Sequence, residues 1–106
     1  MKNYSEVVTL CGSRKFANTF RQLEWHLSRL GIVVLSPILI DNREITATEA
    51  QLFGQLHLKK IDLAVGIFVV DVNGYVGEST KKEIAYAKLH HKKVWYYSAE
   101  KDDLGL

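Results

Sequence analysis

Short runs of apolar residues recur along the chain with the length of buried strands. They cover Val7–Cys11 and residues 32–35, 63–70 and 94–97. Runs of this kind, nearly continuous and rich in β-branched residues, are typical of strands that are buried on both faces of a parallel sheet. The run over residues 63–70 is the longest and is expected to lie at the centre of the sheet.

Between these runs, apolar positions recur at the period of a helix. The first set is spaced by steps of four and three, which brings together on one helical face Phe16, Phe20, Leu23, Leu27 and Leu30. Gly31 is expected to end this helix. Good helix formers predict a second helix that begins at Thr46 or Thr48 and ends at Ile61. A third helix is predicted over residues 80–90, with inward-facing side chains Ile84, Ala87 and Leu89.

The alternation of strands and helices predicts the fold class. Repeated strand–helix–strand units favour a single Rossmann-like (flavodoxin-like) α/β domain, with a mostly parallel sheet of about four to five strands and helices on both faces. The 106 residues, 47% of them hydrophobic, suit one core, so we expect one domain over residues 1–106. Residues 38–45 fit no element clearly, and the polar tail 98–106 is expected to be ordered only in part.

Composition narrows the choice of partners. The formal net charge of +2 comes from scattered lysines rather than a basic block, so a nucleic acid polymer is not expected as a partner. A single cysteine excludes an internal disulfide. Apolar runs are shorter than the roughly 20 residues of a membrane helix, and residues 1–6 lack the apolar core of a signal peptide. We therefore expect no membrane partner and a cytoplasmic location.

The loops after the first and third strands are the predicted ligand site, because ligands of such sheets bind beyond the carboxyl ends of the strands. Gly12, Ser13 and Arg14 follow the first strand and precede a helix. Backbone N–H groups, a hydroxyl and a guanidinium can converge there on a phosphate or a ribose. The spacing matches neither a Walker loop nor a full dinucleotide fingerprint, so a simple turn is the alternative.

The segment from Gly77 to Glu83 is more informative. Glycine permits close approach of a ligand, and Ser79, Thr80 and the free N–H groups of a helix start can bind an anion. Glu83 is then expected to face the same opening. The alternative is a capping box over residues 80–83, in which Glu83 only bonds back to the start of the helix. The spacing alone favours capping slightly over catalysis.

Other polar and aromatic residues are candidates with ordinary alternatives. Asp71 ends the long apolar run and could orient a sugar hydroxyl or share a proton with a glutamate, or it could form an Asx turn. Tyr75 and Tyr86 could stack on a base, or they could belong to the core or an interface. Cys11 is expected to be a small buried residue rather than a nucleophile.

No metal site or other cofactor is expected. The four histidines, His26, His57, His90 and His91, show no metal-ligand spacing with supporting carboxylates. With Cys11 as the single cysteine, a thiolate zinc site is not expected either.

Three segments together resemble the nucleoside 2-deoxyribosyltransferase-like family. They are the strand followed by Gly-Ser-Arg, the Lys-Ile-Asp-Leu-Ala entry into a strand at residues 60–64, and Gly-x-Ser-Thr-x-x-Glu-Ile-x-Tyr-Ala at residues 77–87. The last segment is also similar to the Gly-x-Gly-Thr-x-x-Glu motif of the Lonely-guy phosphoribohydrolases in the same wider superfamily. Ser79 stands where that motif has glycine, and Val65 stands where relatives commonly carry aspartate.

The resemblance implies binding of a small-molecule nucleoside or nucleotide and cleavage or base exchange at its N-glycosidic bond, as in a hydrolase or a transferase. It implies that Glu83 is the nucleophile or the sugar-orienting carboxylate. Glu78 stays an alternative, because Gly77 stands six residues before Glu83 rather than the two found in the deoxyribosyltransferases. Asp71 would be the partner acid.

The same resemblance implies that a 5′-phosphate would be held by Ser13, Arg14, Ser79 and Thr80, and that the pocket is completed in a homodimer. The competing hypothesis is a non-catalytic nucleotide-binding or sensing domain, in which capping accounts fully for Glu83. A flavin carrier is disfavoured, because no Thr/Ser-rich phosphate loop follows the first strand.

Overall fold

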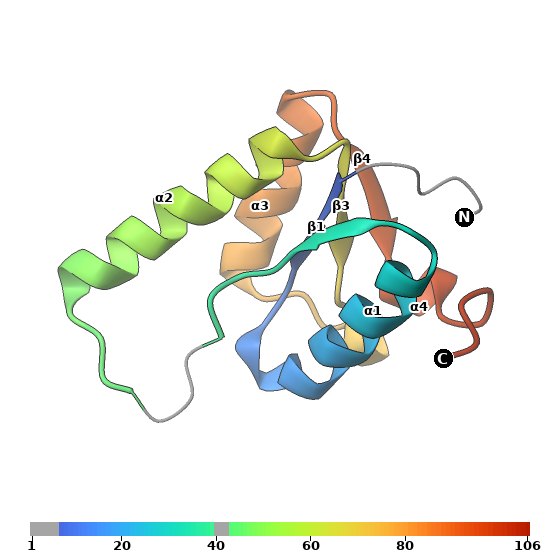
Figure 1. Cartoon of the computed structure of the whole chain (residues 1–106). Coiled ribbons are helices and arrows are strands. Elements are labelled where there is room, and N and C mark those ends of the chain that lie inside the picture. Colours follow the sequence, from blue (N-terminus) through green and yellow to red (C-terminus); the bar gives the residue numbers. More distant parts are fainter. Residues whose placement is uncertain (1–6, 40–42) are drawn as a thin grey trace.

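A parallel sheet forms the centre of the molecule in the computed structural model, which describes residues 7–39 and 43–106 (Figure 1). Within these residues the sheet has four strands, in the order β2 (Val33–Leu35), β1 (Val7–Cys11), β3 (Gly66–Val69) and β4 (Lys93–Tyr96). All neighbouring strands are parallel. The α/β Rossmann-like fold is therefore confirmed, and β3 lies next to β1 in the middle of the sheet, as its continuous apolar sequence predicted.

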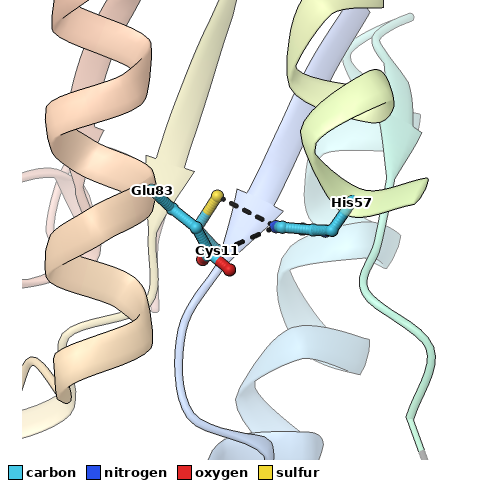
Figure 2. Close-up of side chains that lie close together, drawn as sticks. All are labelled: Cys11, His57 and Glu83. Carbon is cyan, nitrogen blue, oxygen red and sulfur yellow. Dashed lines mark hydrogen bonds and ion pairs between the residues drawn. The ribbon is translucent and has the colours of Figure 1, made fainter. Parts of the chain in front are cut away.

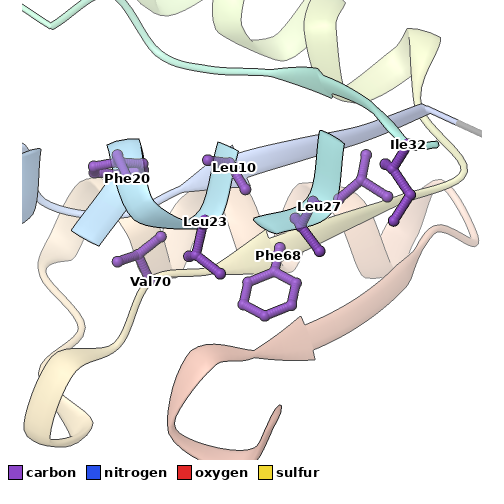
Figure 3. Close-up of a cluster of buried hydrophobic side chains, with 8 residues drawn as sticks. Leu10, Phe20, Leu23, Leu27, Ile32, Phe68 and Val70 are labelled. Carbon is purple, nitrogen blue, oxygen red and sulfur yellow. The ribbon is translucent and has the colours of Figure 1, made fainter. Parts of the chain in front are cut away.

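Helices cover both faces of the sheet. α1 (Ala17–Arg29) packs on one face through a buried cluster made of Val8, Leu10, Phe20, Leu23, Leu27, Ile32, Phe68 and Val70 (Figure 3). α2 (Ala47–Leu63) and α3 (Glu78–Leu89) cover the opposite face, where the buried residues Cys11, Ile61, Ile67, Val69 and Ala87 gather. Successive side chains of a strand point to opposite faces, so Leu10 faces α1 while Cys11 faces α2 and α3.

The helix starts separate real caps from apparent ones. Thr46 forms a capping box at the start of α2, because its Oγ1 accepts from the Glu49 N–H at 3.0 Å and Glu49 Oε1 accepts from the Thr46 N–H at 2.9 Å. α3 begins at Glu78, two residues earlier than predicted, with Gly77 as its N-cap and no side-chain cap. The predicted capping box over residues 80–83 is therefore wrong, since these residues already lie inside the helix.

Helix ends and faces also differ in detail from the predictions. Leu89 was expected to face inward, but 75% of its surface is exposed. It stands five residues after Ile84, which turns it well away from the buried side of α3. None of the described helices has the length and apolar character needed to cross a membrane.

The C-terminal segment is more ordered than its polar sequence indicated. β4 ends at Tyr96, one residue earlier than predicted, and α4 (Tyr97–Glu100) follows. Leu104 and Leu106 pack against the cluster beneath α1. Of the ambiguous stretch 38–45, the residues on either side of 40–42 form no helix or strand. Residues 40–42 lie outside the described residues, as do residues 1–6, on which the absence of a signal peptide was argued.

The contact between β3 and β4 leads to a stability prediction at Gly66. A Cβ atom at Gly66 would lie 2.6 Å from the Trp95 ring and 2.7 Å from the Lys93 carbonyl oxygen. Gly66→Ala must therefore displace the strands, and we expect it to lower the free energy of unfolding by about 2–4 kcal/mol in urea denaturation.

Gly54 provides the matched control for this substitution. It lies within α2, and a Cβ there would meet no described atom within 4 Å. Gly54→Ala is expected to raise the free energy of unfolding by about 0.5–1 kcal/mol, because alanine favours the helix. Equal stability of the Gly66→Ala and wild-type proteins would contradict the packing argument.

Candidate functional site

A cavity of about 370 Å³ lies at the carboxyl edge of the sheet, between the loop after β1, α2 and the start of α3. This volume falls at the lower end of the range for small-molecule sites. The described residues that line it are Gly12, Ser13, Arg14, Pro37, Ile38, Ile45, Ala50, Phe53, Gly54, His57, Tyr75, Gly77, Glu78, Ser79, Thr80 and Glu83. The two loops singled out from the sequence are thus brought together.

The loop after β1 forms one wall of the cavity. Gly12 passes close to the end of β3, where a Cβ atom would lie 3.0 Å from both the Cβ and the carbonyl oxygen of Val70. The Ser13 hydroxyl accepts a hydrogen bond from the Lys15 N–H at 3.4 Å and caps the 3-10 turn Arg14–Phe16. Arg14 is exposed at the cavity wall. Ser13 therefore shapes the turn, while the guanidinium of Arg14 is accessible to an anion.

The start of α3 forms the facing wall. Gly77 is its N-cap without a side-chain bond, and the first intrahelical bond runs from the Lys81 N–H to the Gly77 carbonyl oxygen at 3.0 Å. The N–H groups of residues 78–80 precede that bond and carry the positive end of the helix dipole. An anion is the ligand that suits such a helix start. The exposed Glu78 carboxylate, 3.2 Å from Lys81 Nζ, lies at the rim.

Glu83 lies one helical turn further along α3 and meets two side chains from other elements. Its Oε1 is 3.6 Å from Nε2 of His57 on α2, and that nitrogen is 3.3 Å from Sγ of Cys11 at the end of β1 (Figure 2). Cys11 is fully buried, and the side chains of His57 and Glu83 are 8% and 22% exposed. We call these three residues the Cys11–His57–Glu83 cluster.

Burial sets the charge of this cluster. It raises the pKa of Glu83 to about 7, against a smaller lowering by a hydrogen bond with the Cys11 thiol. Burial, with a smaller effect from Lys60, lowers the pKa of His57 to about 4. It also raises the pKa of Cys11, as does nearby Glu83. At pH 7 the imidazole and thiol are therefore neutral and Glu83 is about half ionised, so His57 and Glu83 do not form an ion pair.

His57 is the residue of this cluster that sequence reasoning missed. It stands 46 positions after Cys11 and 26 before Glu83, so no local spacing links the three side chains. The histidine spacing in the sequence indicates no supporting carboxylate, whereas the fold brings Glu83 Oε1 within 3.6 Å of His57 Nε2. The ligand atoms of Cys11, His57 and Glu83 lie within 4.8 Å of one another, close enough to hold a metal ion. One signal could have pointed to this cluster: a histidine on the sheet-facing side of α2 and a cysteine at the end of the strand that this helix covers.

Asp71 is not brought to the cavity. Its buried carboxylate accepts hydrogen bonds from the Ser98 N–H at 2.8 Å and the Ser98 hydroxyl at 2.6 Å. It therefore holds the first turn of α4 and is absent from the described cavity lining. The Asx turn does not form, because the Asp71 side chain makes no bond to the turn that follows it. The expected roles as sugar ligand or proton-sharing acid stay predictions, and the two hydrogen bonds to Ser98 disfavour them.

The two tyrosines singled out from the sequence have different surroundings. Tyr75 lines the cavity and is 46% exposed, with Lys15 Nζ 3.4 Å from its ring centroid. Tyr86 donates a hydrogen bond to Asp62 at 2.7 Å and its ring lies 4.1 Å from that of His90, outside the described cavity lining. Of the two, Tyr75 is the one available to a ligand.

The raised pKa of Glu83 leads to a prediction on stability. Between its ordinary pKa of 4.5 and about 7, the folded chain binds more protons at this site than the unfolded chain does. Stability at this site is therefore lost as the pH rises through 7. We expect Glu83→Gln to exceed wild type in free energy of unfolding by about 1–3 kcal/mol at pH 8, and by much less at pH 5.

Urea denaturation in a chelating buffer, which keeps metal ions off the cluster, measures this difference. Glu78→Gln is the control, because its carboxylate is 85% exposed and should change stability by less than about 0.5 kcal/mol at either pH. An effect of Glu83→Gln that is the same at pH 5 and pH 8 would contradict the assignment of a desolvated, titrating carboxyl.

Comparisons with known proteins assign no family to this geometry. No protein-family model matches the sequence. A comparison with curated proteins finds no significant match either.

Proposed function

We propose that the protein binds a nucleoside or a nucleoside 5′-monophosphate in this cavity and cleaves its N-glycosidic bond at Glu83. The observation that supports this proposal is the position of Glu83. Its carboxyl group borders the cavity one helical turn beyond an uncapped helix start that suits an anion. The resemblance of residues 77–87 to the deoxyribosyltransferase-like family supports the same role for this glutamate.

The binding step uses both walls of the cavity. A 5′-phosphate would accept hydrogen bonds from the first N–H groups of α3 and from the guanidinium of Arg14. Glu83 stands five residues after Glu78, a rise of about 7.5 Å along the helix, and long side chains on a helix lean back toward its N-terminus. A sugar anchored at the helix start would therefore bring its C1′ toward Glu83. The base could stack on the partly exposed ring of Tyr75, on the face that Lys15 does not cover.

The chemical step is nucleophilic substitution at C1′. An ionised Glu83 oxygen forms a bond to C1′ while the C1′–N bond breaks. The electron pair of the broken bond leaves with the base, which takes a proton from water and leaves hydroxide. Water then attacks C1′ and gives its proton to that hydroxide, which releases the Glu83 carboxylate and the free sugar. A second base in place of water would give base exchange. His57 and Cys11 are positioning residues, because both contact Glu83 from its buried side.

A second candidate is binding without catalysis. Retaining glycosidases use two carboxyl groups about 5–5.5 Å apart. In the described part of the cavity the other carboxylate is Glu78, which is exposed and pairs with Lys81 at 3.2 Å, while Asp71 is held by Ser98. Acid assistance would have to come from water or, in the homodimer that the resemblance implies, from the partner protomer. A nucleotide-sensing domain needs no such group.

The first test measures the release of free base. The protein is incubated in a chelating buffer with nucleosides, deoxynucleosides and their 5′-monophosphates, and the free base is detected by chromatography. We expect Glu83→Gln to lower the rate at least about a hundredfold, the range for loss of a catalytic group. Glu78→Gln, the rim control, should stay within about threefold of wild type.

The possible results separate the candidates. Undiminished release by Glu83→Gln contradicts the role of this residue. No release by any protein, together with a higher melting temperature in the presence of a nucleotide, supports the binding domain instead.

The second test concerns the phosphate. Arg14→Gln should raise KM for 5′-monophosphates about tenfold, which corresponds to loss of one partly exposed, charge-assisted hydrogen bond, and should leave KM for nucleosides unchanged. Arg21→Gln is the control, because Arg21 lies on α1 and its guanidinium bonds to Asn18 at 3.3 Å. An equal rise in KM for nucleosides and monophosphates would show that Arg14 does not read the phosphate.

A further inference from the structure

The Cys11–His57–Glu83 cluster presents the three kinds of donor atom that zinc prefers in proteins: a sulfur, an imidazole nitrogen and a carboxylate oxygen. They come from β1, α2 and α3 and point toward one another (Figure 2). We propose that these three side chains bind one Zn²⁺ ion. This inference does not depend on the proposed function.

The spacing of the donor atoms matches a tetrahedral site. With zinc bonds of about 2.3 Å to sulfur and about 2.0–2.2 Å to nitrogen and oxygen, a tetrahedron separates S from N by about 3.6 Å and N from O by about 3.4 Å. The corresponding distances in the cluster are 3.3 Å from Cys11 Sγ to His57 Nε2 and 3.6 Å from that nitrogen to Glu83 Oε1. The third pair, Cys11 Sγ and the Glu83 carboxylate, lies within 4.8 Å, against about 3.6 Å in the tetrahedron, so the side chains have to shift by up to about 1 Å to accept the ion.

The charges also balance. Zinc would take the Cys11 sulfur as a thiolate, so the thiol proton, and any proton on Glu83, would pass to solvent as the ion binds. A thiolate, a carboxylate and a neutral imidazole then give the Zn²⁺ site no net charge. A neutral site suits a cluster whose sulfur is fully buried, because an uncompensated charge there would be strongly destabilising.

The ligand set selects the metal and leaves one position open. A thiolate is a poor ligand for Mg²⁺ or Ca²⁺, which take oxygen ligands, and a good one for zinc. His57 and Glu83 both line the cavity, so water or a ligand atom in the cavity can supply the fourth donor. Three protein ligands and one position for water or a ligand atom are characteristic of a catalytic rather than a structural zinc site.

The other ring nitrogen of His57 limits the affinity. Metal-bound histidines usually donate their second N–H to a carboxylate, a carbonyl or water, and loss of that partner weakens binding about 10–100-fold. The buried Nδ1 of His57 has no hydrogen-bond partner among the residues that the structure describes. We therefore expect weaker binding than at sites of the same ligands with a complete outer shell.

The test uses the metal-free, untagged 106-residue chain and two metals. Zn²⁺ is expected to bind at one ion per chain, measured by elemental analysis after dialysis. Co²⁺, which takes similar geometry, is expected to give the thiolate-to-metal absorption band and the strong visible bands of a four-coordinate ion. Cys11→Ser should lose the thiolate band, and His57→Gln and Glu83→Gln should each weaken zinc binding at least about tenfold.

Controls separate this site from surface binding. His90→Gln removes an exposed histidine outside the cluster and should leave both signals unchanged. Circular dichroism of each metal-free variant shows whether it is folded, and Glu83→Gln, which changes a partly exposed side chain, covers the case in which Cys11→Ser fails to fold. Absence of stoichiometric zinc, or a Co²⁺ spectrum without the thiolate band, overturns the proposal.

The two proposals can fail separately. A Glu83 oxygen bound to zinc cannot attack C1′, so base release belongs to the metal-free protein and is assayed with a chelator. Zinc binding without any base release leaves the metal site standing and removes the proposed function. Base release without zinc binding supports the proposed function and removes the metal site.

Discussion

The pairing of β1 with β3 is the constraint on which the rest of the structure depends. Their parallel register sets Cys11 opposite Val69, so the two strands end at the same edge and the loops after them leave the sheet side by side. Gly12 and the end of β3 are then in contact, and α3 starts directly across from the turn after β1. The cavity is a geometric result of that register.

Burial at the same edge creates the chemistry. The strand alternation that sends Leu10 into the α1 cluster turns Cys11 toward α2 and α3, where His57 and Glu83 lie. A carboxyl group beside a neutral thiol and a neutral imidazole loses most of its water without gaining a counter-charge, so its pKa rises. Glu83 could act as a nucleophile toward a sugar or as a ligand of a metal ion, but one carboxylate oxygen cannot do both at once.

Much of the fold was predictable from the sequence, because strand length and helical periodicity are local properties. The run at Val7–Cys11 and the apolar face of α1 carry their own signal. The loops lining the cavity were also predictable, since the carboxyl ends of parallel strands define the ligand edge in advance. Nucleotide binding by those residues stays a prediction.

What the sequence could not indicate depends on long-range contacts. The capping box was assigned to Thr80 and Glu83 by spacing, but an earlier helix start at Glu78 placed both inside the helix and freed Glu83 for the cluster. Asp71 was predicted as a site residue because it follows a strand at the ligand edge. In the structure its carboxylate instead accepts hydrogen bonds from Ser98, 27 positions away.

That hydrogen-bonded pair has a mechanical consequence. Asp71 precedes the turn Val72–Gly74, which leads to Tyr75 at the cavity rim. The Asp71 carboxylate binds Ser98 and so holds α4 against the start of this turn. The C-terminal segment thereby supports the loop that carries Tyr75. Asp71 and Ser98, which lie outside the described cavity lining, therefore help to fix the position of a lining residue. Substitutions at Ser98 are therefore expected to change the loop that carries Tyr75, although Ser98 lies outside the described cavity lining.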